Sequence, residues 1–424
     1  MTAQSARASA TRPSRLTRPL YAYAFLEEFV LLYPLYALLF TETGLSVAQI
    51  SSLFVLWSLT SVLLAIPTGA WADVVPRHLL LALAPLLTGA GFAFWLFLPS
   101  YWSFALGFVL WGAAGALASG ALEALVYTEL THRGAADRYA RVMGVTRALG
   151  VAAVGTATLL AVPVMAYGGY AAIGLASLAA CVLCALTGLT LPESRPPRSS
   201  PDHGPDDTAA TDPGTGRADA GAAPEPGYLE TMRLGLAEAR GSRRVRTAIL
   251  LVVTVTAFWG MLDEYLPLLA ASSGVATEDV PLVVLVVWIC VTAGGLLAGP
   301  ASRLSPRAVG VLLALAAVAI AAGALLGTAP GWVLLGCGFG VCQMANVVAD
   351  ARLQDSITGS SRATVTSLAE AGTETVSGAS FLLYAGVFLV AGHATAFAVF
   401  AVPYLFAAVL AARGGRTRPA EPTG

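Results

Sequence analysis

Two adjacent acids inside an apolar run are the side chains of this sequence best suited to chemistry. Glu27 and Glu28 stand near the middle of the run at 20–40, LYAYAFLEEFVLLYPLYALLF. About 20 apolar residues let a helix cross a bilayer, and a carboxylate at that depth costs roughly 2.5–3.5 kcal/mol on insertion scales. We therefore expect both carboxyl groups to face protein, water or a bound proton rather than lipid.

A second acidic pair, Asp263 and Glu264, repeats this arrangement later in the chain. Adjacent residues are about 100° apart around a helix, so we expect one acid of each pair to face a central cavity and the other a neighbouring helix. One interpretation is proton carriage, in which a buried carboxyl group binds a proton on one side of the membrane and releases it on the other. The alternative is a structural hydrogen bond from a permanently protonated acid. The recurrence favours contact with protons or substrate for at least one of the four.

Two further sets of charged residues lie in apolar runs. Glu123 and Arg147 are expected at similar depth in neighbouring spans, where an ion pair would offset the cost of burying each charge. The sequence is equally compatible with a permanent structural ion pair and with an ion pair that breaks during transport. Glu370 and Glu374 lie four residues apart, on one helix face, and repel each other when both are ionised. We expect one of them to be protonated, in a proton or cation site or on the wall of a wet cavity.

Aromatic residues accompany both acidic pairs. They could clasp an apolar or aromatic substrate, but aromatics at helical spacing more often pack or anchor a helix at the membrane interface, and packing is the interpretation favoured by spacing alone. They are Tyr21, Tyr23, Phe25, Phe29, Tyr33 and Tyr36 in the first run and Phe258, Trp259 and Tyr265 around the second pair.

The composition places these acids in an integral membrane protein. Of 424 residues, 57% are hydrophobic and 12% are charged, whereas roughly a quarter of the residues of soluble domains are charged. The mean hydropathy is +0.73. All 24 basic residues are Arg, which excludes a P-loop ATPase and a Schiff-base pump because both need a Lys. We predict no enzyme activity, metal or cofactor, since the four His are scattered along the chain: His78, His132, His203 and His393.

Apolar runs of spanning length predict twelve transmembrane helices and hence an all-α membrane fold. With the amino terminus in the cytoplasm, every Arg falls on the cytoplasmic side, as the positive-inside rule requires, so we predict that both termini are cytoplasmic. Richness in Ala, Gly and Arg without Lys points to a bacterial protein and thus to the plasma membrane. The predicted spans are 17–40, 47–71, 79–98, 102–128, 141–163, 170–191, 247–271, 280–301, 308–328, 331–350, 363–390 and 394–412.

The spans divide into two halves joined by a linker. The linker spans 192–246, and its residues 192–227 change abruptly to a composition of Pro, Gly, Asp, Ser and Ala that is typical of disorder. Within it, 228–246 is interpreted as a helix on the inner membrane surface or as a solvated linker helix. The predicted order is a cytoplasmic tail at 1–19, a six-helix bundle at 20–191, the linker at 192–246, a second six-helix bundle at 247–412 and a cytoplasmic tail at 413–424.

The two halves repeat one another at matched positions in the same order. The first match is that of Leu26-Glu-Glu-Phe29 with Leu262-Asp-Glu-Tyr265. Six spans per half is an even number, so the halves share one orientation and form parallel repeats about an axis along the membrane normal. The other matches are Gly44 with Gly274, Trp57 with Trp288, Gly69 and Arg77 with Gly299 and Arg307, and Glu129 and Arg141 with Asp350 and Arg362.

The segment Gly69-Ala-Trp-Ala-Asp73-Val-Val-Pro-Arg77-His78 lies between the second and third spans. With two parallel six-helix halves and a long central loop, it resembles the major facilitator superfamily, whose loop here has a Gly, an Asp four residues on and then basic residues. The resemblance implies the major facilitator fold and a cytoplasmic latch of Gly69, Asp73 and Arg77, with Arg362 as the partner of Asp73. The alternative is solvated charges, whose pairs contribute about 0–1 kcal/mol. Three positions depart from the family pattern: Val74, Pro76 and His78.

Together these features predict a secondary transporter that works by alternating access around a cavity between the halves. The predicted activity is proton-coupled export of a small, partly apolar compound. The family's antiporter signature is missing from 150–155, and uptake by symport or facilitated passage is the alternative. A receptor or scaffold that has lost transport is a third possibility. The expected partners are a small-molecule substrate, protons and the lipid bilayer, with no nucleic acid, and a monomer is the working expectation for the oligomeric state.

Overall fold

The computed structural model describes residues 14–118, 121–193, 241–356 and 362–413, and these residues form helices and turns without any strand. Two short 3-10 helices, η2 (Ala136–Arg138) and η3 (Thr277–Asp279), accompany the α-helices. The α-helices are α1 (Ser14–Glu28), α2 (Tyr36–Glu42), α3 (Val47–Val74), α4 (Arg77–Phe97), α5 (Tyr101–Ala118), α6 (Ala121–His132), α7 (Tyr139–Leu189), α9 (Arg243–Ser272), α10 (Val280–Ala301), α11 (Pro306–Leu326), α12 (Ala329–Ser356) and α13 (Arg362–Arg413).

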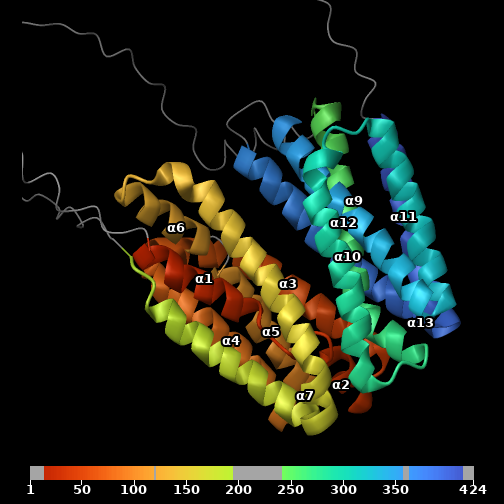
Figure 1. Cartoon of the computed structure of the whole chain (residues 1–424), viewed down its shortest axis with the longest axis horizontal. Helices are drawn as coiled ribbons and strands as arrows, with labels where there is room; N and C mark the ends of the chain where they lie inside the picture. The colour runs from red at the N-terminus through yellow and green to blue at the C-terminus, as the bar shows by residue number, and fades with distance from the viewer. Residues whose placement is uncertain (1–13, 119–120, 194–240, 357–361, 414–424) are drawn as a thin grey trace, which may run out of the picture.

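Nine of the described helical segments are long and apolar enough to cross a membrane. Two of them, α7 and α13, each contain one glycine with non-helical backbone angles, Gly169 (φ 58°) and Gly392 (φ 75°). Residues with a side chain rarely adopt a positive φ, so glycine permits the chain to turn back there (Figure 1). Each of these long helices therefore holds two of the spans that the hydropathy pattern predicts.

The helices gather into two bundles, one of α1 to α7 and one of α9 to α13 (Figure 1). The bundles meet along α3 with α13 and along α7 with α10, and α2 packs on α9. They lie close together at the end of the molecule that holds α2 and η3, and they diverge toward the end that holds α6 and the start of α9 (Figure 1). We call the first the meeting end and the second the arginine end.

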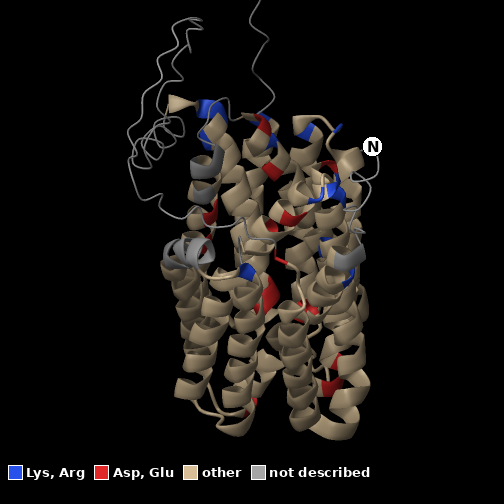
Figure 2. Ribbon diagram, turned by 90° about the vertical axis from the view of Figure 1, so that its left-hand side faces the viewer, with Lys and Arg blue, Asp and Glu red and all other residues tan. Residues whose placement is uncertain are grey.

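The name of the arginine end reflects the charge distribution of the folded chain. Most of the described Arg residues lie there (Figure 2). The turns at the meeting end carry acids instead, among them Glu42, Glu278 and Asp279. The charge asymmetry that the sequence predicts along the chain is thus an asymmetry between the two ends of the molecule.

Matched turns at the meeting end support the internal repeat. Gly44 (φ 94°) and Gly274 (φ 88°) both have left-handed backbones. The residue after each glycine donates its backbone N–H to the carbonyl five residues earlier, from Leu45 to Phe40 at 3.1 Å and from Val275 to Ala270 at 3.2 Å. The helices α2 and α9 therefore end in the same kind of glycine turn.

Within each bundle, glycines let helix backbones touch. A Cβ added to Gly294 of α10 would lie 1.9 Å from the carbonyl oxygen of Gly340 in α12, and one added to Gly91 of α4 would lie 2.9 Å from that of Gly107 in α5. Such contacts have no room for a methyl group. The glycine-rich stretches therefore serve close packing, and each bundle is built as a tightly packed unit.

One predicted span differs in the structure. A continuous helix over 17–40 is wrong, because α1 ends at Glu28 and helix resumes only with α2 at Tyr36. Pro34 explains the break, since proline has no N–H to donate to Val30, crowds that carbonyl and disfavours helical geometry at the preceding Tyr33. The predicted surface helix at 228–246 lies outside the described residues up to 240, and α9 begins at Arg243.

Candidate functional site

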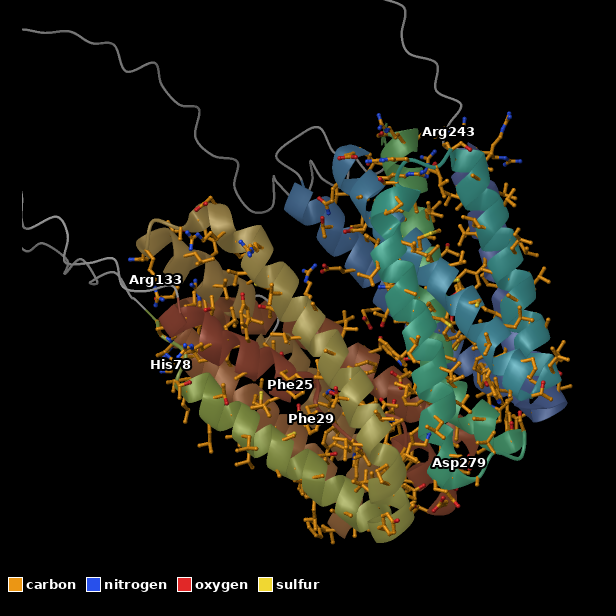
Figure 3. All side chains as sticks on the ribbon, viewed as in Figure 1. Phe25, Phe29, His78, Arg133, Arg243 and Asp279 are labelled. Atoms are coloured by element: carbon orange, nitrogen blue, oxygen red, sulfur yellow. The ribbon has the colours of Figure 1, made fainter. Side chains whose placement is uncertain are left out.

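The broken helix places the first acidic pair inside the molecule. Phe29, the first residue after α1, lies midway along the first bundle rather than at either end (Figure 3). The unwound segment at 29–35 keeps some backbone hydrogen bonds of its own, and the N–H of Leu32 donates to Ser177 Oγ in α7 at 3.1 Å. A buried backbone group without a partner is costly, so this bond from a neighbouring helix helps to hold the break open.

A cavity of about 340 Å³ lies between the two bundles at the break. Three carboxyl groups line it, those of Glu28 at the end of α1 and of Asp263 and Glu264 in α9. We expected one acid of each pair to face the cavity, and for the second pair this is wrong, because Asp263 and Glu264 both line it. The lining residues are Glu28, Tyr33, Pro34, Tyr36, Ala37, Trp57, Trp111, Val154, Thr158, Asp263, Glu264, Pro267, Val284 and Trp288.

Two of the three carboxyl groups have donors within the protein. The hydroxyl of Tyr36 donates to Glu264 Oε2, which joins α2 to α9 across the interface. The Trp288 indole hydrogen bonds to Asp263. No described residue hydrogen bonds to the Glu28 carboxyl group, and its partly exposed side chain lines the cavity. Glu28 is thus the member of the set to which no described residue donates a hydrogen bond.

An aromatic stack forms one wall of this cavity. The rings of Tyr33 and Trp111 lie 5.4 Å apart at an interplanar angle of 14°, and those of Trp111 and Trp57 lie 5.2 Å apart at 24°. In the second bundle, Trp288 meets Trp259 edge-on at 5.9 Å. The sequence indicated Trp57 and Trp288 only as matched repeat positions and gave no role to Trp111. The matched positions of Trp57 and Trp288 in the two halves were the signal in the sequence that both bundles contribute aromatic residues to the cavity wall.

A second, smaller cavity of about 170 Å³ lies within the first bundle. Glu27 lines it, and Glu28, Tyr33 and Trp111 line both cavities. Glu28 therefore lies at the boundary between the two cavities, whereas Glu27 lines the smaller one. The lining residues are Leu26, Glu27, Glu28, Tyr33, Ala84, Pro85, Thr88, Trp111, Ala114, Gly115, Ala118, Cys181 and Cys184.

The predicted acid pair on α13 lies outside both cavities. Ser58 Oγ in α3 donates to Glu374 Oε2 at 2.5 Å and so joins the two bundles. Glu370 is exposed and lies within electrostatic range of Asp350, Glu123 and Glu374. These acids come from both bundles and form a second acidic region toward the arginine end.

The predicted pair of Glu123 and Arg147 forms, with 3.4 Å between Glu123 Oε1 and an Arg147 amino nitrogen. However, 53% of the Glu123 side chain and 77% of the Arg147 side chain are exposed, whereas we expected a desolvated pair. The bundles diverge toward the arginine end, which leaves the pair open to solvent (Figure 1). An exposed pair contributes only about 0–1 kcal/mol.

The predicted latch is described in part. The Arg77 guanidinium donates to the Ala124 carbonyl at 3.1 Å and to Thr128 Oγ1 at 2.9 Å, so it ties the start of α4 to α6 within the first bundle. Gly69 belongs to α3, and the side chains of Asp73 and Arg362 lie outside the described set. A contact between Asp73 and Arg362 therefore stays a prediction.

Sequence reasoning missed a polar clip next to that region. His78 Nδ1 lies 2.8 Å from Glu193 Oε2, and the His78 backbone N–H donates to the same oxygen at 3.2 Å. Burial acts to raise the pKa of Glu193, but hydrogen bonds from His78 and the Arg77 backbone outweigh it and hold the pKa below its usual range. The clip fastens the start of α4 to the residues that follow α7.

Comparisons with known proteins agree with this architecture. The family model of the Major Facilitator Superfamily matches residues 20–349. A bacterial homologue of the human lysosomal transporter Spinster, in an inward-facing and unoccupied conformation, is 16% identical with a TM-score of 0.70, over 96% of this chain and 98% of that one. A variant of the nucleoside transporter NupG is 15% identical with a TM-score of 0.71, over 94% and 99%. A D-xylose–proton symporter is 14% identical with a TM-score of 0.63, over 94% and 96%. Such identities show the fold alone, and no curated protein sequence matches the chain.

Proposed function

This chain belongs to the major facilitator superfamily of transporters, and we propose that it exports a small, partly apolar compound from a bacterial cell in exchange for protons. The observation that carries the proposal is the cavity between the bundles with Glu28, Asp263 and Glu264 on its wall. A carboxyl group beside a ligand space binds either a proton or a polar group of the ligand, so the two compete. That competition couples the movement of one to the movement of the other.

The arrangement of the bundles supports alternating access. With the Arg-rich end in the cytoplasm, as the positive-inside rule favours, the bundles diverge toward the cytoplasm and meet on the outer side (Figure 1). Transport then requires the contacts at the meeting end to open while the arginine end closes. One cavity between two bundles of a single chain is enough for this cycle, so we propose a monomer.

Protons are an adequate driving force for this export. One charge that crosses 100 mV yields about 2.3 kcal/mol, and one pH unit adds about 1.4 kcal/mol. Their sum corresponds to a concentration gradient of several hundredfold for one proton exchanged per substrate. No nucleotide hydrolysis is needed to reach a useful export gradient.

Flux in proteoliposomes under an imposed pH gradient tests this function. We expect substrate to move against the direction of the protons and at least one of Glu27→Gln, Glu28→Gln, Asp263→Asn and Glu264→Gln to abolish coupled flux while expression persists. Glu278→Gln is the matched control, because Glu278 is exposed in η3 and away from both cavities. Normal coupled transport by all four amide variants would show that these acids are structural.

Uptake by symport is the second candidate. It is favoured by the similarity of the fold to that of a D-xylose–proton symporter and by the missing antiporter signature at 150–155. The same proteoliposomes separate the two, since a symporter moves substrate with the protons and a facilitator moves it without a response to the gradient. A receptor or scaffold would give no flux at all.

A further inference from the structure

We infer that the substrate is an organic cation, with a protonated amine or quaternary nitrogen attached to a flat aromatic body. This inference rests on the proposed function, since it assigns a substrate class to the same cavity. Four features of the cavity favour this class of ligand: its charges, the end of α1, the aromatic stack and its size.

The charges of the cavity wall are of one sign. Glu28, Asp263 and Glu264 line it, and no Arg or His is among the described lining residues. An anionic ligand would therefore enter a desolvated space with no cation to pair with, which is costly. A cationic ligand would pair with these carboxylates, and no described residue donates to Glu28 that the ligand would have to displace.

The end of α1 adds to this preference. A helix has a partial negative charge at its C-terminus, and α1 ends at Glu28 inside the molecule, beside the cavity. A carboxylate at that position is disfavoured unless a proton or another cation binds close to it. The helix end and the side chain thus favour the same kind of ligand.

The aromatic stack provides a surface for the rest of the ligand. Tyr33, Trp111 and Trp57 stack face to face along one wall, and Trp288 lies on the lining contributed by the second bundle. A cation over a Trp or Tyr face gains about 0.5–2 kcal/mol, and a flat ring can extend a stack of this kind. Pro34, Ala37, Val154, Pro267 and Val284 make the remaining wall largely apolar.

The size of the cavity limits the body of the ligand. Its volume of about 340 Å³ is at the lower end of the roughly 300–1,000 Å³ that ligand pockets occupy. That space suits one or two fused rings with a short amine.

Binding of three matched naphthalene compounds to the detergent-solubilised full chain tests the inference. The probes are (1-naphthylmethyl)trimethylammonium, 1-naphthylmethanol and 1-naphthylacetate, which share a ring and differ in charge. Calorimetry is expected to give at least tenfold tighter binding of the cation than of the neutral compound and no detectable binding of the anion. Equal or tighter binding of the neutral compound or the anion overturns the inference, and so does the absence of binding by all three.

Variants assign the binding to this cavity. We expect Glu28→Gln to remove the preference for the cation over the alcohol and Trp57→Leu to weaken binding of both at least fivefold. Glu278→Gln and Trp102→Leu are the matched controls, since both side chains are exposed and distant from the cavity. If Trp57→Leu fails to fold by its melting curve, Trp57→Phe, which keeps a ring, is expected to retain the preference for the cation. Unchanged cation binding in Glu28→Gln overturns the inference.

Flux separates this inference from the proposed function. If the cation binds selectively but no pH gradient drives its movement in proteoliposomes, the assignment of the cavity stands and the transport proposal fails. If the alcohol or the acetate moves under the gradient while the cation does not, transport stands and the cation assignment is overturned.

Discussion

At the scale of single residues, the interface between the bundles is held by a few hydrogen bonds to acids and hydroxyl groups. Tyr36 bonds to Glu264, Ser58 to Glu374, and Ser51 shares a hydrogen bond of 2.5 Å with Tyr265. When the donor to a buried carboxyl group is removed, the carboxyl group is left without a partner. The loss of stability is then larger than the net stabilisation that the hydrogen bond provides. These bonds therefore contribute to the stability of this conformation and to the free energy needed to open the interface between the bundles.

Removal of the Tyr36 hydroxyl should reveal the strength of its bond to Glu264. We expect Tyr36→Phe to lower the free energy of unfolding by about 1–3 kcal/mol, because the Glu264 carboxyl group loses its donor. Chemical unfolding in detergent measures this change. In the double variant with Glu264→Gln, the two effects should be clearly less than additive, and full additivity would mean that the two groups do not interact.

The clip between His78 and Glu193 should make stability depend on acid pH. The folded pKa of Glu193 lies below its unfolded value of about 4.3, so the clip stabilises the fold at neutral pH and this contribution is lost as the pH falls through the folded pKa. We expect Glu193→Gln to lower the melting temperature more at pH 7 than at pH 3. The exposed Asp137→Asn is the control, and an equal loss at both pH values would contradict the electrostatic origin.

At the scale of helices, two different devices shape the molecule. Glycines bring helix backbones into contact inside each bundle, and a proline opens a helix at the site. Proline also acts in the second bundle, where Pro267 removes the donor that the Asp263 carbonyl would have within α9. A proline therefore follows both acidic pairs, but only the first pair lies at a helix end, since α9 continues to Ser272.

The contact between α10 and α12 can be tested with two neighbouring glycines. A Cβ at Gly294 would lie 1.9 Å from the Gly340 carbonyl oxygen, whereas one at Gly295 would meet only the Gln343 side chain at 3.9 Å. We expect Gly294→Ala to destabilise the protein by about 2 kcal/mol or more, since backbone atoms must move apart, and Gly295→Ala to be close to neutral. Melting temperatures of the two variants measure the difference, and equal values would mean that the helices are not in contact there.

The sequence predicted the bundles and the acids because both follow from the cost of polar groups in an apolar environment. Hydropathy located nearly every helix, and the burial cost of a charge singled out Glu28 and Asp263. It could not predict the break after Glu28, because hydropathy does not record backbone geometry, although Pro34 was a visible signal. Nor could it find Trp111, since an aromatic residue that packs in a core and one that lines a cavity look alike until the neighbouring helices are placed.

At the scale of the whole molecule, transport requires the bundles to exchange the meeting end for the arginine end as the place of contact. The interface in this structure is formed chiefly by α3 with α13 and α7 with α10, and it tapers toward the arginine end (Figure 1). Tightly packed bundles move as units more readily than they deform. The weakest part of the molecule is therefore the interface, and a small loss of binding there should shift its equilibrium.

Weakening the contact between Ser51 and Tyr265 should shift this equilibrium toward opening at the meeting end. Loss of one such hydrogen bond is worth about 0.5–1.5 kcal/mol, so Tyr265→Phe should raise the population of the alternative state roughly two- to tenfold. Spin labels on a cysteine-free background measure this population, with one pair at positions 43 and 278 at the meeting end and one at 132 and 244 at the arginine end.

We expect the distance distribution at the meeting end to gain a longer component and the one at the arginine end a shorter component, because rigid bundles exchange one opening for the other. Tyr101→Phe, which loses a 3.0 Å hydrogen bond to Ser52 within the first bundle, is the matched control and should change neither. Distances that lengthen at both ends would indicate separation of the bundles rather than alternating access.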